Sequence, residues 1–319
     1  MGRQHVRVLS ELPDIEVVSA IDVSEEARRR VEEHVPVSTT DDWRAALDRS
    51  VDAVINALPT AEHHAVTLEL LEAGKHVLVE KPIAAATSEA EDLIRAAERH
   101  DRVLVVGHVE RYNPAVEMLA GLLREGVLGD VVTIAARRVG IARPLAPNTD
   151  VLVDLAIHDI DICAHLLPGS QGRLAFASAR ALWGNQLEDH TDLVLRFGDA
   201  VATLQANWIT PVKVRRLTVT GTMGLADVDY IDQTVRLFRG APEVFEGPLW
   251  DFFAVARESE PEDVPVERAE PLRAELSNFV NRVRAGDSSL TASRQAAQAL
   301  ALAVEARSVV RGAVSKEGR

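Results

Sequence analysis

The chain has 319 residues, of which 47% are hydrophobic, and this length suits two domains of ordinary size. Its net charge of −14 argues against a nucleic-acid partner, whose footprint would be a clustered basic face. It lacks an apolar run of about eighteen residues that would predict a membrane span, and its first residues lack the pattern of a signal peptide. The single cysteine, Cys163, excludes a disulfide within the chain, and we expect a cytoplasmic protein.

The first half alternates short apolar strands with helices. Ser24 marks a helix start and Gly74 a helix stop, and residues 51–58 and 76–80 are apolar runs typical of strands covered on both faces. This alternation predicts a Rossmann-type α/β fold for residues 1–110, with a doubly wound parallel sheet that binds ligands at the carboxyl ends of its strands. The expected strands are 15–22, 51–58, 76–80 and 103–106, and the expected helices are 3–12, 24–34, 41–49, 60–73 and 88–100.

Residues 111–319 have the pattern of an α+β domain. Strand-like runs follow one another from 173 to 238, which predicts a large, mainly antiparallel sheet with helices on one face. Such a sheet leaves its other face free, so we expect a homodimer or homotetramer formed through that face. Residues 240–266 indicate an irregular connection. The expected helices are 113–124, 150–167, 267–285 and 292–310, and the last two could pack back on the first domain.

The helix expected over residues 150–167 (DVLVDLAIHDIDICAHLL) carries a candidate for proton transfer. Asp154 and His158 stand four residues apart, so both side chains project from one helical face, and Asp161 lies on nearly the same side. A carboxylate that orients an imidazole is a common arrangement for a general base at neutral pH. Spacing alone equally allows a solvated polar face. No further His or Cys cluster completes a ligand set, so we expect no metal.

The beginning of the chain departs from the usual dinucleotide-binding pattern, which opens with a strand and a G-x-G-x-x-G turn. Gly2 leads directly into the expected first helix and could be the third glycine of that turn. Asp22 ends the next strand, where an acid binds the adenosine ribose and favours NAD over NADP. The first strand would then be absent. We expect the natural protein to begin about a dozen residues upstream, a strand plus a turn; a shortened, non-binding variant is the alternative.

Three arginines could form a local basic pocket for a phosphate-bearing ligand despite the acidic net charge. Arg137, Arg138 and Arg143 fall within seven residues at the end of the strand expected over 131–139. A solvated strand end explains the same three residues equally well.

Several stretches together resemble the glucose–fructose oxidoreductase / inositol dehydrogenase (Gfo/Idh/MocA) family. VEKPIA at 79–84 resembles the family's signature, DLAIHDID at 154–161 its second motif, and LPTAEHHA at 58–65 the loop that lies against the cofactor. The closing segment, 270–286, is also similar. Within the family, the stretches HVERYNPAV at 108–116, RRVGIARP at 137–144 and ANWITPVKVRRLTVTG at 206–221 most resemble the UDP-N-acetylglucosamine 3-dehydrogenases.

The resemblance implies an NAD-dependent dehydrogenase that removes hydride from a sugar hydroxyl carbon, with the 3-hydroxyl of UDP-N-acetylglucosamine as the expected group. Lys81 would stabilise charge on the reacting oxygen, His158 would be the general base, and Asp154 would orient its ring. A free polyol such as myo-inositol is the alternative substrate. A non-catalytic protein that senses a sugar or nucleotide is the alternative from another class.

The same resemblance implies which residues hold the cofactor. Thr149-Asp150-Val151 stands where many family members carry a glycine run, and this blurs which substrate is held. The implied cofactor residues are Gly2 and Asp22 on the adenosine side, and Pro59, His63, Glu80 and Lys81 on the nicotinamide side.

Further residues are implied on the substrate side. Arg111 and Asn113 would face the cleft, although Asn113 before Pro114 equally suits a helix cap. Trp208 and Lys213 would bracket a sugar or phosphate contact, although a tryptophan in a strand is more often part of a core or an interface.

Overall fold

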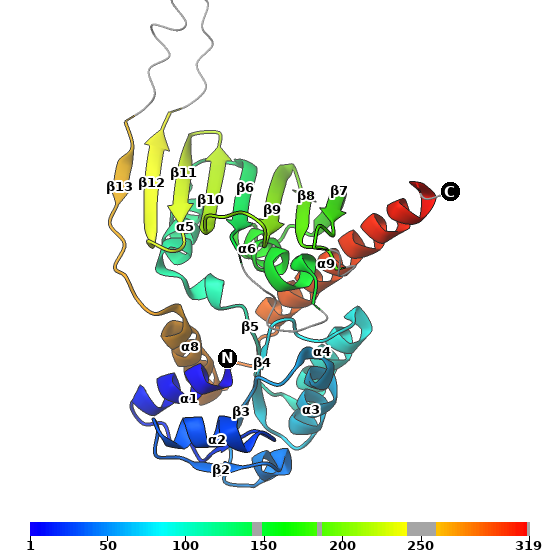
Figure 1. Cartoon of the computed structure of the whole chain (residues 1–319). Helices are drawn as coiled ribbons and strands as arrows, with labels where there is room; N and C mark the ends of the chain where they lie inside the picture. The colour runs from blue at the N-terminus through cyan, green and yellow to red at the C-terminus, as the bar shows by residue number, and fades with distance from the viewer. Residues whose placement is uncertain (142–148, 184–186, 241–259, 318–319) are drawn as a thin grey trace, which may run out of the picture. The chain divides into compact units, whose positions relative to one another are not determined.

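The structure of the chain, a computed structural model, describes residues 1–141, 149–183, 187–240 and 260–317. These residues form two compact units (Figure 1). The first consists of Met1–Tyr112 and Ala269–Ala301, and the second of Asn113–Arg268 and Leu302–Arg319. Within the described ranges, none of the helices is long and apolar enough to cross a membrane.

The first unit has the Rossmann-type α/β fold, and its strands form two separate parallel sheets. In the usual strand order, 3-2-1-4-5-6, the first strand lies between the second and the fourth. β1 and β3 correspond to those two neighbours, and no strand in the described part of the unit pairs with both. One sheet holds β1 (Ser19–Ile21) and β2 (Ser38–Thr40), and the other holds β3 (Ala53–Asn56), β4 (His76–Glu80) and β5 (Leu104–Gly107).

Local sequence signals explain where the helices of this unit begin and end. The Ser24 side chain accepts a hydrogen bond from the Ala27 amide, and Gly74 follows α3 with φ +79°. The helix expected over 41–49 is instead the 3₁₀ helix η1. The helical elements are α1 (Gly2–Glu11), α2 (Glu25–Glu32), η1 (Trp43–Leu47), α3 (Thr60–Glu72), α4 (Thr87–His100), η2 (Val109–Tyr112) and α8 (Pro271–Ala285).

The core of the first unit brings together residues that are far apart in the sequence. Val8 of α1 and Phe279 of α8 pack in one buried cluster with Leu78 of β4 and Val105 of β5. Burial of such side chains contributes roughly 1.5–3 kcal/mol each, so α8 is part of this unit's core although it lies late in the sequence.

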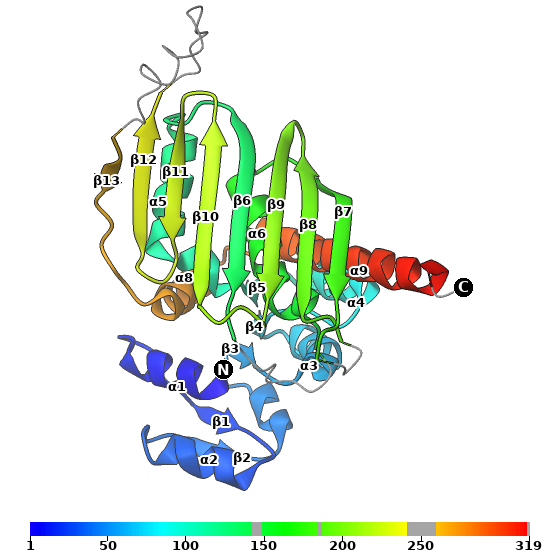
Figure 2. The ribbon, with the colours of Figure 1, turned by 45° about the horizontal axis from the view of Figure 1, so that its top comes forward.

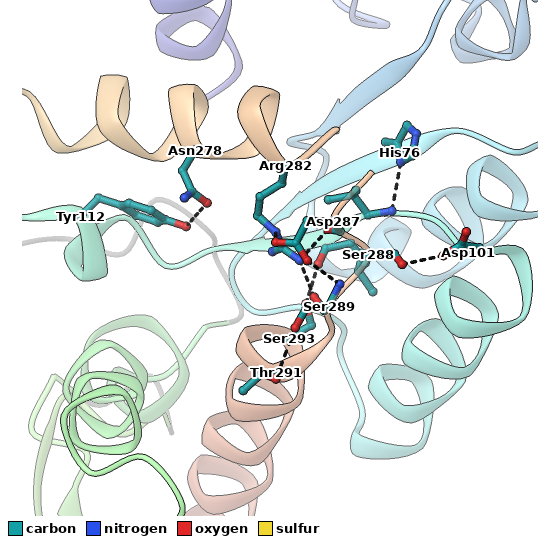
Figure 3. Close-up of polar contacts among 12 residues, drawn as sticks. His76, Asp101, Tyr112, Asn278, Arg282, Asp287, Ser288, Ser289, Thr291 and Ser293 are labelled. Carbon is teal, nitrogen blue, oxygen red and sulfur yellow. Dashed lines mark hydrogen bonds and ion pairs between the residues drawn. The ribbon is translucent and has the colours of Figure 1, made fainter. Parts of the chain in front are cut away.

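The loop between α8 and α9 (Thr291–Glu317) is fastened to the same unit by polar contacts (Figure 3). Ser293 Oγ donates to the Leu104 carbonyl oxygen at 2.6 Å, and Ser288 Oγ donates to Asp101 at 2.5 Å. Arg282 binds Asp287 within the loop. The beginning of α9 is therefore held at the edge of the sheet where β5 lies.

The second unit is an α+β fold with one mixed, mainly antiparallel sheet of eight strands in the order β13-β12-β11-β10-β6-β9-β8-β7. Among the described strands of this sheet, only β6 and β9 pair in parallel. β13 lies where the sequence indicated an irregular connection, so that expectation is wrong for its three residues. The strands are β6 (Val131–Val139), β7 (Gly172–Arg180), β8 (His190–Phe197), β9 (Ala200–Asn207), β10 (Val214–Gly221), β11 (Gly224–Asp229), β12 (Thr234–Arg239) and β13 (Glu262–Val264).

Helices cover one face of this sheet. α5 (Pro114–Arg124) packs on β11 and β12, and α6 (Ile157–Leu166) packs on β6 and β9. Figure 2 looks onto the other face, over which no helix of the described residues lies. Side chains alternate between the two faces along each strand. Ile134 and Leu217 are fully buried on the face covered by helices, whereas Arg137 and Arg216 are exposed on the uncovered face, which we call the open face.

Candidate active site

The element that carries Asp154 and His158 starts as a π-helical turn, η3 (Leu152–Ala156), and continues as α6. Asp154 lies in the π turn and His158 in the first turn of α6, and both side chains are partly buried. The sequence predicted a regular helix here. A π turn is rare and occurs frequently at functional sites, so this departure coincides with the residues expected to do chemistry.

The two other acids of this helix are buried. Asp159 is 2% exposed and Asp161 is fully buried, which makes both part of the packed interior. Burial raises the pKa of the Cys163 thiol, so the thiolate needed for reactivity is suppressed. In the described part of the chain, no group of three or more His, Cys, Asp or Glu side chains is arranged to hold a metal ion.

Arg138 of β6 forms a bidentate ion pair with Asp159. Its Nε and Nη2 atoms each lie 2.9 Å from a carboxylate oxygen, and its guanidinium lies 5.0 Å from the centre of the Tyr230 ring. Arg138 is only 3% exposed, so the interpretation of a solvated strand end is wrong for it. Its guanidinium fork binds Asp159, and its expected contact with substrate stays a prediction. Arg137 points to the open face and donates to Gln205, and Arg143 lies outside the described residues.

The EKP motif follows the end of β4. Glu80 accepts a hydrogen bond from its neighbour's backbone, Lys81 N–H, at 3.2 Å, and its other oxygen lies 2.7 Å from His5 Nε2. Burial pushes the pKa of Glu80 upward, but the contacts with His5 and Lys81 together outweigh it, and the pKa lies below its ordinary value. Gly107 faces Glu80 in the next strand, and a Cβ there would lie 3.1 Å from the carboxylate. Lys81 itself is partly buried and precedes a cis peptide bond to Pro82.

His63 of α3 is 1% exposed and connects the loops that follow β3 and β4. Its Nδ1 lies 2.8 Å from the Pro82 carbonyl oxygen, and its Nε2 lies 2.8 Å from the Leu58 carbonyl oxygen. Pro59 precedes the first residue of α3. The imidazole is thus occupied by backbone on both sides, and its structural role is to hold the Leu58–Pro59 and Lys81–Pro82 segments together.

The residues at the start of the chain suit the phosphate and adenosine ends of a dinucleotide. α1 begins at Gly2 without a side-chain cap, and a helix N-terminus of this kind binds anions. A Cβ on Gly2 would meet only Ala57, at 4.0 Å, so the backbone there is open to close approach. Asp22 is exposed at the end of β1, and one carboxylate oxygen accepts from the Ser24 amide at 2.8 Å. These donors and this acid fit NAD chemically.

The residues expected on the substrate side have several different environments. Arg111 is 8% exposed and donates to the Ala292 carbonyl oxygen at 3.3 Å. Asn113 is the cap of α5, accepting from the Ala115 amide at 3.1 Å, so the helix-cap alternative describes its side chain. Trp208 is 1% exposed, as a core tryptophan would be, and it stacks on Trp183 with the two ring centres 6.4 Å apart.

Lys213 is exposed and lines a groove of about 720 Å³ on the open face of the eight-stranded sheet. Arg137, Asp192, Gln205 and Arg216 line the same groove. Its floor is made of strands of the second unit alone, so Lys213 belongs to a surface distinct from the helix of Asp154 and His158.

The sequence did not reveal a second group of charges beside that helix. Asp150, immediately before it, is 2% exposed and lies 3.3 Å from Arg307 of α9. Glu188 is 6% exposed and pairs with Arg311 through two 2.8 Å hydrogen bonds. The bond from Arg311 lowers the pKa of Glu188. The only sign of these charges in the sequence was Asp150, which stands where many family members carry a glycine run.

Family models match both units of the chain. A model described as "Oxidoreductase family, NAD-binding Rossmann fold" matches residues 1–108, and one described as "GFO/IDH/MocA C-terminal domain" matches residues 116–227.

Individual proteins are similar over most of the chain. A UDP-N-acetylglucosamine 3-dehydrogenase of Acidithiobacillus ferrooxidans is 31% identical over 245 residues, 75% of this chain and 72% of that protein. A solved structure of the enzyme of that name from the same organism superposes with a TM-score of 0.82 at 25% identity, covering 97% of this chain and 94% of that one. A scyllo-inositol 2-dehydrogenase (NADP(+)) of Bacillus subtilis is 30% identical over 54% of this chain and 51% of its own length.

A structure of a 3-ketoreductase from Actinomadura kijaniata, solved with NADP, has a TM-score of 0.78 at 20% identity and shares the fold. It covers 96% of this chain and 92% of its own. Together, the two family models and the 31% identity across both units establish that the chain belongs to the Gfo/Idh/MocA family of oxidoreductases.

Proposed function

We propose that this sugar or polyol oxidoreductase is an NAD-dependent dehydrogenase of a nucleotide sugar, and that it oxidises the 3-hydroxyl of UDP-N-acetylglucosamine. The observation that carries the proposal is the 31% identity to an enzyme of that name over 75% of the chain. The alignment with that enzyme, over 245 residues, is too long to lie within either unit alone.

Bound NAD would supply the hydride acceptor, and this chain's residues would hold it and move the proton. Asp22 would accept hydrogen bonds from the adenosine ribose, and the amides at Gly2 would face the phosphates. Pro59 and the Glu80–Lys81 segment would border the nicotinamide, with His63 holding these two segments together from behind.

Three side chains would act on the reacting hydroxyl. His158 would take its proton as the carbinol carbon loses hydride, and Asp154 would orient the imidazole. Lys81 would donate a hydrogen bond to the same oxygen and stabilise the negative charge that develops there. Two observations support these roles: Asp154 lies in a π turn, which is frequent at functional sites, and Lys81 directly follows β4, at the strand end where such sheets bind ligands.

A free polyol is a second candidate substrate, because an inositol dehydrogenase is 30% identical over about half of this chain. A panel of UDP-N-acetylglucosamine, other nucleotide sugars, myo-inositol and scyllo-inositol, each with NAD and with NADP, separates the candidates by absorbance of the reduced cofactor. The proposal expects turnover with the nucleotide sugar and NAD. Turnover with free polyols alone would refute it, and binding of sugar without turnover would favour a sensing protein.

We further propose that the open face of the sheet joins two copies of the chain. A polar row crosses it in register through Asp192, Gln205, Arg137, Arg216 and Asp229. Arg137 and Arg216 face each other directly, which is unfavourable unless acids lie nearby. Asp229 pairs with Arg216 at 3.3 Å within the same chain, and if two copies packed with their rows displaced along each other, the acids at the ends of one row would lie over the cations at the centre of the other.

A further inference from the structure

We infer that Arg311 of α9, together with Arg307, positions the π turn that carries Asp154. This inference rests on the proposed function, in which Asp154 orients the general base. Neither arginine belongs to a motif of the sequence, and both act on the turn through the buried carboxylate of Asp150.

Asp150 holds the beginning of the turn with both its backbone and its side chain. Its Oδ1 accepts from the Val153 amide at 3.1 Å, and its carbonyl oxygen accepts from the Asp154 amide at 3.0 Å. The Val153 amide is among the donors that a helix start leaves without backbone partners, and the Asp154 amide makes an intrahelical bond to Asp150. The orientation of Asp150 therefore determines where the backbone of Asp154 lies.

Arg307 and Arg311 hold the other carboxylate oxygen of Asp150, Oδ2. Arg307 Nη1 lies 3.3 Å from it and Arg311 Nη2 lies 3.6 Å from it. The Asp150 side chain is 3% exposed, so its charge depends on these two cations rather than on water. Without them, the carboxylate would gain by turning toward solvent, and it would release the Val153 amide as it turned.

Glu188 completes a closed ring around the start of the turn. Its carboxylate binds Arg311 through two 2.8 Å hydrogen bonds, which fix the guanidinium plane. Its backbone carbonyl accepts from the Val151 amide at 2.9 Å. Arg311 is thus joined to the π turn by two routes, one through Asp150 and one through Glu188. Together these contacts fix the position of the start of the turn.

The test compares Arg311→Met with Arg294→Met, a matched control on the same helix. Arg294 forms only an exposed pair with Glu98 at 3.3 Å. We expect Arg311→Met to lower kcat by about tenfold to a hundredfold, with little change in the KM for NAD, because the base is misplaced rather than cofactor binding lost. Arg311→Lys should recover part of kcat. Arg294→Met should stay within about twofold of the parent.

Hydrogen exchange of the amides of residues 152–158 gives a readout that needs no activity. We expect faster exchange there in Arg311→Met than in the parent or in Arg294→Met. Unchanged exchange would overturn the inference, and so would faster exchange with an unchanged kcat.

A His158→Ala background separates this inference from the proposed function. If His158 is the base, adding Arg311→Met to His158→Ala should lower kcat almost no further. If Arg311 had a merely structural role, the added substitution would lower kcat by the same factor as it does in the parent. If His158→Ala alone leaves kcat unchanged, the proposed base is wrong, and the exchange measurement still decides whether Arg311 positions the turn.

Discussion

The imidazole Nδ1 of His63 lies 2.8 Å from the carbonyl oxygen of Pro82, the residue after Lys81. Nε2 of the same ring lies 2.8 Å from the Leu58 carbonyl oxygen. Both ring nitrogens therefore face backbone carbonyl oxygens, one from each of two loops. The resemblance placed His63 beside the cofactor. The structure gives it a bridging position between the two loops expected to border the nicotinamide.

We predict that His63→Phe lowers kcat by about tenfold or more, because the Lys81–Pro82 segment loses its tether while the ring volume is kept. Each carbonyl left without a donor should also cost about 1–3 kcal/mol in the free energy of unfolding. Steady-state kinetics and urea unfolding check both effects. His64→Phe is the control, since His64 binds only Asp92 at the partly exposed surface of α3. Equal kcat values for the two variants would contradict the tether.

The Glu80–His5 contact should make stability depend on pH in the acid range. The pKa of Glu80 is lowered in the folded state, so its contribution is fully present above the ordinary value of 4.5 and is lost as the pH falls through the folded value. In a series of urea unfolding curves, the difference in unfolding free energy between the parent and Glu80→Gln should shrink as the pH drops below 4.5. The exposed Glu98→Gln should show no such trend, and a difference for Glu80→Gln that stays constant with pH would refute this account.

Breaking the Arg138–Asp159 pair should be among the costlier single changes in the second unit. Arg138→Met leaves a buried carboxylate without its cation, and we expect a loss of about 3–5 kcal/mol in the free energy of unfolding. Adding Asp159→Leu to Arg138→Met should restore much of the lost free energy of unfolding. Arg239→Met on β12, where the arginine forms an exposed pair with Glu262, should cost less than about 0.5 kcal/mol. Similar losses at both arginines by chemical denaturation would argue against the buried pair.

The proposed dimer predicts that a charge on the open face separates the subunits. Phe176 is 55% exposed and lines the groove on that face. Light scattering should show a dimer or tetramer for the parent and smaller species for Phe176→Glu. Val23→Glu, at a residue 86% exposed in the first unit, should leave the assembly unchanged. A monomeric parent would refute the interface.

Local signals in the sequence located many elements well. β4 and β6 have the bounds expected for them, and Asn113 caps α5 as its position before Pro114 allowed. These features depend on neighbours within a few residues. The strands of the first unit form two separate parallel sheets, and a start of the natural protein further upstream stays a prediction.

Contacts between residues far apart in the sequence could not be predicted from local signals. Arg138 and Asp159 are 21 residues apart, and Arg307 and Asp150 are 157 apart, so no local pattern joins them. The alternation of side chains along β6 could have shown that Arg137 and Arg138 face opposite ways. The π turn at Asp154 depends on the ring of charges around Asp150, which only the folded chain brings together.

Transfer of deuterium tests the central claim most directly. The parent protein is incubated with NAD and UDP-N-acetylglucosamine deuterated at C3, and the reduced cofactor is examined by mass spectrometry. The account predicts one deuterium in NADH, and unlabelled NADH when the label is at C4. NADH without deuterium from the C3-labelled sugar, or no NADH at all, would contradict it.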